Sequence, residues 1–407
     1  MFSILVTVFV LCPAAGNAQM RPGKMVETGP FNPAVLSGKS LLYDKEKTGG
    51  RDGLFVDIDA TAWFYDAEYA HALYDGFTDV GMRLRPTIGW NMGNRGMLQI
   101  GFTSSLLAGL DSLHELRPIV RLCYAPARWL TVVAGSIYGG ANHGLEAVLY
   151  DPDRAMMARQ EEGLQIMTHT SFWHSDTWVD WWHYLVPGTA DQEYFTMGSS
   201  HNMVIVDRAL HGDSSATSAE FRLEMPLIFL ANHRGGQVNT IDTSVLTHFN
   251  ERAALRGVFT IPCSRVAHEL AFEMPVYFYH RSDHAENGFA VNPNVTYSCH
   301  HAEFQHRAGW NVFCKTGFWH GDGFASYFGS PQFQTLYLPS TTDKVRQLLW
   351  CGVGAEHGFG RIGIGMDVRF YYDLTYGEHD LTVGVYMRAR QKVYPRNKER
   401  RIWKGHK

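Results

Sequence analysis

Charged residues are scarce in this sequence, at 19% of 407 residues, and the formal net charge is only −4. With no strong basic field to attract a polyanion, we expect no nucleic-acid partner. Aromatic residues make up 13% and hydrophobic residues 45% of the chain, which excludes an intrinsically disordered protein. The mean hydropathy of −0.19 is too low for a bundle of membrane-spanning helices.

The sequence also lacks the short motifs of common metal and hydrolase sites. Cys12 lies in the apolar N-terminal run, and the other five cysteines form no CxxC pair, so neither a zinc knuckle nor a complete disulfide framework is expected. GxSxG, HExxH and P-loop motifs are absent. We therefore expect no cofactor, no metal site and no catalytic residues, and hence a protein that is not an enzyme.

The N-terminus resembles an export signal. Phe2 to Leu11 is apolar, Pro13 interrupts the run, and Gly16-Asn17-Ala18 offers small residues at cleavage-site spacing. A membrane anchor is the alternative, but the run falls short of the ~20 residues that a spanning helix needs. No Lys or Arg precedes the run, so either the true start lies upstream or the signal is weak. We predict a signal peptide over 1–18.

Alternation with a period of two recurs from about residue 54 to residue 393. Leu54, Val56 and Ile58, for example, alternate with Asp57 and Asp59. A soluble β-sandwich would also alternate. The runs, however, reach the ~9 to 11 residues that a tilted bilayer-crossing strand needs, and aromatic residues crowd their ends. Both features favour a membrane barrel.

We predict an all-β protein, a transmembrane antiparallel up-and-down β-barrel of about 16 strands, with a range of 14 to 18. Such a barrel places the protein in the cell outer membrane, in contact with lipid and lipopolysaccharide. The candidate strands are about 54–64, 79–90, 97–106, 115–124, 128–138, 162–173, 176–186, 193–206, 217–231, 242–255, 265–279, 289–302, 305–319, 346–357, 361–372 and 381–393.

The connections between these strands alternate in length. Those after odd strands tend to be long and polar, and those after even strands tend to be tight, as expected for long outer loops and short periplasmic turns. We expect the long loops to be surface-exposed, and 139–161 and 320–345 to be possible docking surfaces for envelope proteins. Connections that break the pattern are 187–192, 207–216 and 256–264.

The patterns divide the chain into four segments. They are the signal peptide (1–18), an irregular N-terminal segment that is either a periplasmic tail or a plug (19–53), the barrel (54–393) and a C-terminal tail (394–407). The tail carries six Lys or Arg between Arg396 and Lys407, against Glu399 alone. It is either a solvated tail or a contact with an anionic envelope polymer.

Seven short phrases stand out between about residues 60 and 335: Trp63 to Tyr69, Arg83 to Pro86, Tyr138 to His143, Glu161 to Gln165, Asp176 to Trp181, His233 to Gln237 and Trp319 to Phe324. Together they resemble an uncharacterised family of predicted outer-membrane β-barrel proteins from Bacteroidota. The resemblance implies fold and location, and it implies no catalytic or binding residues. The basic tail departs from the aromatic-ended last strand that is usual in outer-membrane barrels.

Charged residues share one of the two faces of the predicted strands. This pattern predicts a lumen that is filled with water or lined by ion pairs, because unpaired charges are costly in lipid. Ion pairs that fill the lumen without conduction are one interpretation, and a porin-like channel for small polar or anionic solutes is the one we prefer. The alternatives are a non-conducting subunit of a secretion or surface complex and, less favoured, an outer-membrane hydrolase. The lumen-lining candidates are Asp57, Asp59, Arg83, Arg85, Arg117, Arg121, Asp180, Glu220, Arg222, Glu224, Asp367, Arg369, Arg388 and Arg390.

Twenty histidines make a local site worth considering. A cluster runs from His300 to His306, where a polar turn explains it better than a metal site. Two sets resemble acid–base groups near a barrel rim: His174 with Ser175 and Asp176, and His320 with Asp322. A histidine beside an aspartate is common by chance, so neither set outweighs the missing motifs.

Overall fold

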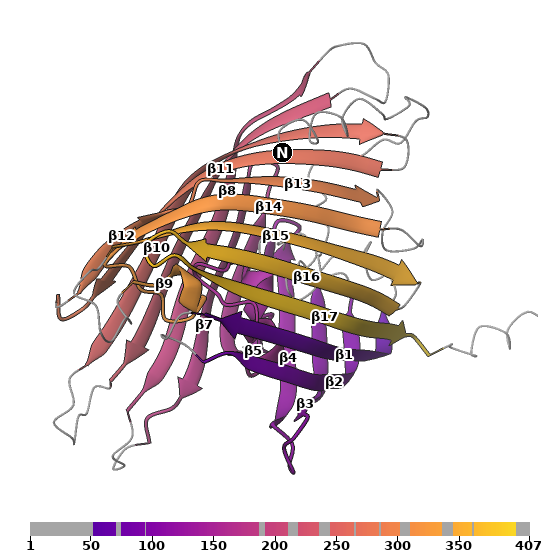
Figure 1. Ribbon diagram of the computed structural model, residues 1–407. Helices are drawn as coiled ribbons and strands as arrows, with labels where there is room; N and C mark the ends of the chain where they lie inside the picture. Colours follow the sequence, from indigo (N-terminus) through magenta and orange to yellow (C-terminus); the bar gives the residue numbers. More distant parts are fainter. Residues whose placement is uncertain are drawn as a thin grey trace, which may run out of the picture.

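The protein is a closed antiparallel β-barrel (Figure 1). A computed structural model describes residues 52–70, 75–93, 95–186, 192–210, 219–235, 245–263, 266–284, 286–301, 310–335, 345–359 and 362–395. The sheet closes because β1 pairs with both β2 and β17. The strands are β1 (Gly53–Tyr69), β2 (Phe77–Met92), β3 (Gly96–Leu107), β4 (Glu115–Ala127), β5 (Leu130–Ser136), β6 (Glu162–His169), β7 (Trp173–His183), β8 (Tyr194–Leu210), β9 (Ala219–Arg234), β10 (Leu246–Cys263), β11 (Val266–Arg281), β12 (Asn287–Val291), β13 (Asn294–His301), β14 (Trp310–Asp322), β15 (Val345–Phe359), β16 (Ile362–Asp373) and β17 (Glu378–Val393).

The predicted count of sixteen crossings is confirmed. β12 and β13 both pair with β11 and with β14, so they are two halves of one crossing. Pro293, which has no backbone N–H, lies at the break between them. The expected connection over 256–264 was wrong, because β10 continues to Cys263 and pairs there with Val266. This correction restores a tight connection after an even strand.

Each strand presents one face to the lumen and the other to the outside, as the period of two requires. In β7, Asp176, Trp178 and Asp180 are buried on the inward face, whereas Trp173 and Trp181 are exposed on the outward face. Large exposed apolar side chains recur on the outward phase of the other strands, as a lipid-facing wall needs. No helix among the described residues is long and apolar enough to cross a membrane.

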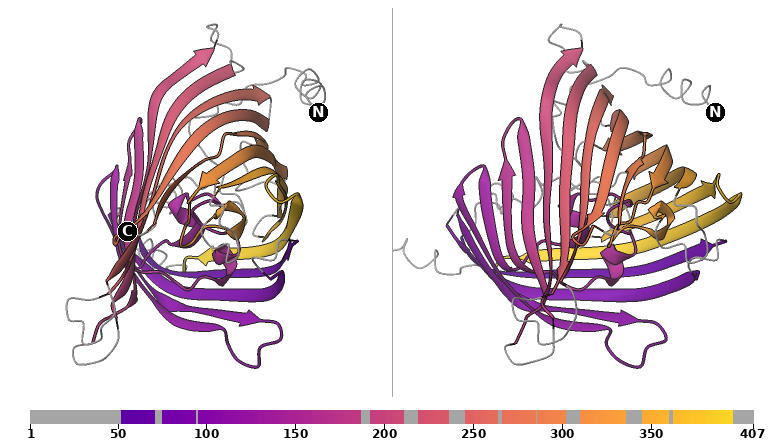
Figure 2. Two further views of the ribbon diagram at one scale, coloured as in Figure 1. Left: turned by 60° about the vertical axis from the view of Figure 1, so that its left-hand side comes forward. Right: turned by 90° about the vertical axis from the view of Figure 1, so that its left-hand side faces the viewer.

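Two long connections lie inside the barrel and form a plug, which we define as residues 137–161 and 323–335 (Figure 2). The first contains the short helices η3 (Gly140–His143) and α2 (Arg154–Met157), and the second contains η4 (Pro331–Phe333). Both follow odd crossings and therefore enter from the same end of the barrel. The expectation that these loops are exposed docking surfaces was wrong for their described parts, which are largely buried.

The plug has an apolar core that explains why the loops fold inward. Leu145, Leu149, Phe324 and Phe333 are almost fully buried, and they pack in one cluster with the equally buried Trp319 of the wall. Burying such a side chain stabilises the fold by about 1.5 to 3 kcal/mol. A loop with this composition therefore gains more inside the barrel than in water.

The predicted end segments lie mostly outside the described residues. The signal peptide (1–18), nearly all of the N-terminal segment (19–53) and the tail beyond residue 395 belong to this group. The division of the chain into these segments stays a prediction. The plug that the structure shows comes from loops between strands.

Candidate functional site

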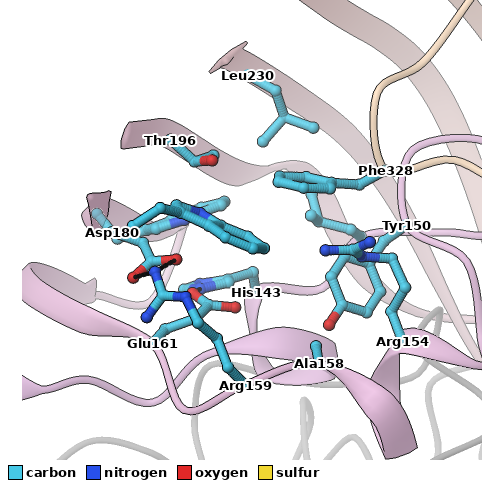
Figure 3. A pocket seen from close by; sticks show the side chains of 13 residues that line it. His143, Tyr150, Arg154, Ala158, Arg159, Glu161, Asp180, Thr196, Leu230 and Phe328 are labelled. Atoms are coloured by element: carbon cyan, nitrogen blue, oxygen red, sulfur yellow. Dashed lines mark hydrogen bonds and ion pairs between the residues drawn. The ribbon is translucent and has the colours of Figure 1, made fainter. Parts of the chain in front are cut away.

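A histidine with two carboxylates joins the plug to the barrel wall. His143 of η3 lies with Nδ1 2.7 Å from Asp176 Oδ2. Its Nε2 is 2.9 Å from Glu161 Oε2 (Figure 3). Its ring stacks on Trp178, with centroids 3.5 Å apart. Gly198 of β8 makes room for this indole, because a Cβ there would lie 2.2 Å from Trp178 Cζ2. We call His143, Glu161, Asp176 and Trp178 the lumen cluster.

The lumen cluster keeps His143 protonated. Burial alone would lower the pKa of His143, but the charges of Glu161 and Asp176 outweigh it and raise the pKa to about 10. Burial likewise opposes ionisation of Glu161, yet His143 holds the pKa of that carboxyl below its usual value. Both ring nitrogens then donate hydrogen bonds, and neither is left to accept a proton. The cluster therefore fixes the plug and is unsuited to general-base chemistry.

Further charged contacts fix the plug around the wall. Arg159 of the plug donates to Asp180 of β7 at 2.8 and 2.9 Å. Three strands further along the wall, Arg252 of β10 lies 2.5 Å from Glu146 of the plug. Arg83 of β2 donates to backbone carbonyls of α2 and its C-cap. Because these groups are buried, removal of one partner would leave an uncompensated charge.

The lumen-lining candidates all lie on the inward phase of their strands, and many of them are ion-paired. Their role in a solute path stays a prediction. The pairs are Asp57 with Arg390, Asp59 with Arg388, Arg369 with Asp367, Arg222 with Glu224, and Asp180 with Arg159 of the plug. Arg83 and Arg121 bind plug and wall carbonyls, and Arg85, Arg117 and Glu220 share the inward phase.

The two histidine sets singled out from the sequence do not form triads. His174 and Asp176 point inward, whereas Ser175 points outward, so the sheet separates them. His320 and Asp322 share the outward face of β14, where His320 contacts Gln347. The cluster from His300 to His306 lies outside the described side chains. In the described part of the chain, no group of three or more His, Cys, Asp or Glu side chains could hold a metal ion.

A polar patch that the sequence reasoning missed lies on the lipid-facing wall. Ser199 and His201 alternate outward along β8 in phase with the exposed Met197, and Thr177 is the register partner of Ser199 on β7. Apolar side chains dominate this face elsewhere, so hydroxyl and imidazole groups here need an explanation. The lipid-facing patch consists of Thr168, Ser175, Thr177, Ser199 and His201.

Hydrogen bonds connect three residues of the patch in a chain, and Thr168 bonds separately to Ser175. Thr177 Oγ1 is 2.7 Å from Ser199 Oγ, and Ser199 Oγ is 2.8 Å from His201 Nε2. Trp173 stacks on the His201 ring with centroids 5.9 Å apart. If Thr177 donates to Ser199, Ser199 donates to His201 and Nε2 is the acceptor. This is the geometry of a nucleophile beside its base.

A signal for this patch was present in the sequence. Ser199 and His201 are two residues apart inside a predicted strand, so they must share a face. Their phase is that of Met197, which is apolar. A search for polar residues in the lipid-facing phase of each strand would have found them. The search for known motifs did not, because Ser-x-His belongs to none of them.

Comparison with known families now gives the class. The family model described as "Lipid A 3'-O-deacylase-type" matches residues 44–398, and the chain belongs to this family. The protein is an outer-membrane β-barrel. The expectation that it is not an enzyme was wrong, because the family is named for an enzymatic activity. The absence of familiar motifs was therefore a poor guide to enzymatic activity.

Solved structures with a similar arrangement are outer-membrane proteins of low sequence identity. A loop-deletion mutant of OmpT from Vibrio cholerae matches with a TM-score of 0.47 and 10% identity, over 84% of this chain and 100% of that one. OprD from Pseudomonas aeruginosa matches with a TM-score of 0.44 and 7% identity, over 84% and 94%. The comparison with curated proteins gives no significant match.

Proposed function

We propose that the protein hydrolyses ester-linked acyl chains of membrane lipids at Ser199 and His201. The observation that carries this proposal is the 2.8 Å contact between Ser199 Oγ and His201 Nε2 on the lipid-facing wall. The name of the family, which describes removal of a 3'-O-acyl chain from lipid A, supports an ester of a lipid as the substrate. A reactive pair on this wall meets lipid without opening the plug.

The chemistry follows from the geometry of the pair. Ser199 Oγ attacks the ester carbonyl carbon while His201 Nε2 takes its proton. His201 then gives that proton to the leaving alkoxide oxygen, so the alcohol departs and the acyl chain stays on Ser199. A water molecule, deprotonated by His201, attacks the acyl group, and the bond to Ser199 Oγ breaks to release a carboxylic acid. His201 gives the proton from water back to Ser199 Oγ. Thr177 is a positioning residue, because its hydroxyl directs the Ser199 hydroxyl towards His201.

The wall around the pair suits a lipid substrate. Trp173 and Trp181 lie outward at opposite ends of β7 and mark the two edges of the apolar band. His201 is in register with Ser175, two residues from Trp173, so the base lies towards the edge next to the tight β6–β7 connection, where water reaches the wall. Acyl chains would lie along the exposed apolar side chains of the neighbouring strands.

The test uses purified barrel in vesicles that contain lipid A, with release of free fatty acid as the readout. Ser199→Ala and His201→Gln should each lower the rate by about 10³-fold or more, because each removes a member of the pair. Ser200→Ala is the matched control, since the neighbouring serine faces the lumen. Full release by Ser199→Ala would disprove the proposed role of the pair.

A solute path is a second candidate function, favoured by accessible cations on the inward face. The side chains of Arg117, Arg388 and Arg390 are 42%, 39% and 53% exposed. Cations in a confined aqueous space favour anions. The plug occupies the middle of this space, so passage would follow its margins. Planar-bilayer recording tests this candidate by measuring ion selectivity. An anion preference in the wild type that is reversed in Arg117→Glu and Arg390→Glu would support it.

A further inference from the structure

A hollow in the lumen lies between the plug and the inner wall, apart from the lipid-facing pair. It is lined by the plug residues Tyr150, Arg154 and Phe328 and by Trp182 of β7. His143 and Glu161 of the lumen cluster line it as well (Figure 3). Its cavity volume is about 20 Å³, room for about one or two water-sized groups, which excludes an acyl chain. The hollow therefore suits a small ligand.

Arg154 is the lining cation that lacks an ion pair. His143 binds Glu161, and Arg159 binds Asp180, but none of the described residues forms an ion pair with Arg154. Its guanidinium instead lies over the ring of Phe328, 4.3 Å from the centroid. A partly buried arginine without a carboxylate partner is costly, so its position is best explained by a ligand of opposite charge.

Two more hydrogen-bond donors in the hollow have no partner among the described residues. The hydroxyl of Tyr150, a residue only 4% exposed, makes no hydrogen bond, and neither does Nε1 of Trp182. Burial and the nearby Glu161 raise the pKa of Tyr150, so its phenol stays protonated and able to donate. Nε of Arg154 is also unsatisfied. Buried polar groups without partners are rare, and donors from three side chains left over around one hollow point to an acceptor.

Asp153, the N-cap of α2, is the carboxyl group that the charge of Arg154 acts on, although the two side chains form no ion pair. Arg154 lowers the pKa of Asp153, but burial outweighs this and raises it. Burial and the charge of Asp153 also raise the pKa of Asp151. Protonation of these carboxyl groups reduces their negative charge, so they compensate Arg154 only in part.

We propose that the hollow is a binding site for a small oxyanion, of the phosphate or carboxylate type, held by Arg154 with the Tyr150 hydroxyl and the Trp182 indole N–H. The guanidinium supplies charge and paired donors, and the two neutral donors select an acceptor-rich ligand. The site does not depend on the proposed hydrolysis, because the barrel wall separates the hollow from Ser199. An occupant would complete the packing of the plug.

Calorimetric titration of the folded barrel in detergent with inorganic phosphate, and separately with acetate, tests this proposal. Tyr150→Phe is the sharper variant, because the hydroxyl has no partner and its loss should leave the ligand-free melting temperature unchanged. The variant should weaken binding about 10-fold, as expected for loss of a hydrogen bond to a charged group. Arg154→Gln should abolish binding.

Arg128→Gln serves as the control, since Arg128 lies exposed in the turn between β4 and β5 and does not line the hollow. It should bind the anion as the wild type does. Tighter binding of phosphate than acetate would assign a tetrahedral oxyanion, and the reverse a carboxylate. Wild-type affinity in both Tyr150→Phe and Arg154→Gln, or no binding of either anion to the wild type, would overturn the proposal.

Discussion

Two histidines close to β7 lie on opposite sides of the same wall. Comparing them distinguishes a histidine that holds the plug in place from one with a proposed catalytic role. His143, inside, stacks on Trp178 and contacts two carboxylates. His201, outside, stacks on Trp173 and contacts a serine hydroxyl. Two carboxylates hold the first imidazole in its charged form, whereas a hydroxyl neighbour leaves the second able to take a proton. The side chains that contact each imidazole therefore determine the role that we assign to it.

Among the substitutions that test this comparison, His143→Ala should cause the largest loss of stability. The change leaves Glu161 and Asp176 buried without their cation, which should lower the free energy of unfolding by about 3 to 5 kcal/mol. Urea unfolding, followed by tryptophan fluorescence, measures it. His201→Ala is the comparison and should cost much less, since it leaves no buried charge. Equal losses in the two variants would contradict the assigned roles.

The same cluster predicts a dependence of stability on alkaline pH. The pKa of His143 is raised to about 10 from an ordinary value near 6.5, so the folded state binds the proton more tightly than the unfolded chain. Its contribution is complete below pH 6.5 and is lost as the pH rises through about 10. The melting temperature should fall over this window, and His143→Gln should flatten the fall. A wild-type curve that stays flat would show that the imidazole is not held charged.

An intermediate effect should follow from placing a charge on the lipid-facing side. Ile364 of β16 is exposed on the outward face, whereas Asp367 is buried inward beside Arg369. Ile364→Arg should destabilise the barrel by about 2 to 4 kcal/mol near the midplane. Heat-modifiability on gels, in which folded barrel migrates faster, reports the yield. Gly363→Ser, on the inward face, should fold normally.

The smallest effect should come from Gly198→Ala, which probes how the wall supports His143. A Cβ at residue 198 would meet the indole of Trp178, and the displaced ring would disturb the stack on His143. Overpacking of this kind costs about 1 to 3 kcal/mol. Thermal unfolding measures the loss. A neutral result would show that Trp178 has room to move without loss of the lumen cluster.

Much of the fold could be predicted from local sequence. Period-two runs and the lengths of the connections sufficed for the sixteen crossings, because side-chain alternation is imposed by strand geometry itself. The end of β10 was misplaced, since Gly257 and Pro262 are typical of loops and only pairing with β11 shows otherwise. The inward fold of 139–161 was missed as well. Its apolar residues have no periodicity, and their burial depends on walls far away in sequence.

The candidate site was harder to predict for a related reason. Asp176 and His143 are 33 residues apart, and only the path of the plug brings them together. The proximity of Ser199 and His201 could have been predicted from the sequence, because residues two apart in a strand share a face. The pair was nevertheless missed, since Ser-x-His matches no known motif and polar residues in the apolar phase of the strands were not considered. Thr177 joins the pair through strand pairing alone.

The most direct test of the two histidine roles compares two matched substitutions, His143→Gln and His201→Gln. For each variant, both the release of fatty acid from lipid A vesicles and the melting temperature are measured. We expect His201→Gln to lower release by about 10³-fold with little change in melting temperature. We expect His143→Gln to lower the melting temperature while folded protein keeps its specific activity. Loss of activity in folded His143→Gln, with wild-type release by His201→Gln, would place the chemistry inside the barrel and contradict the proposed hydrolysis at the lipid-facing wall.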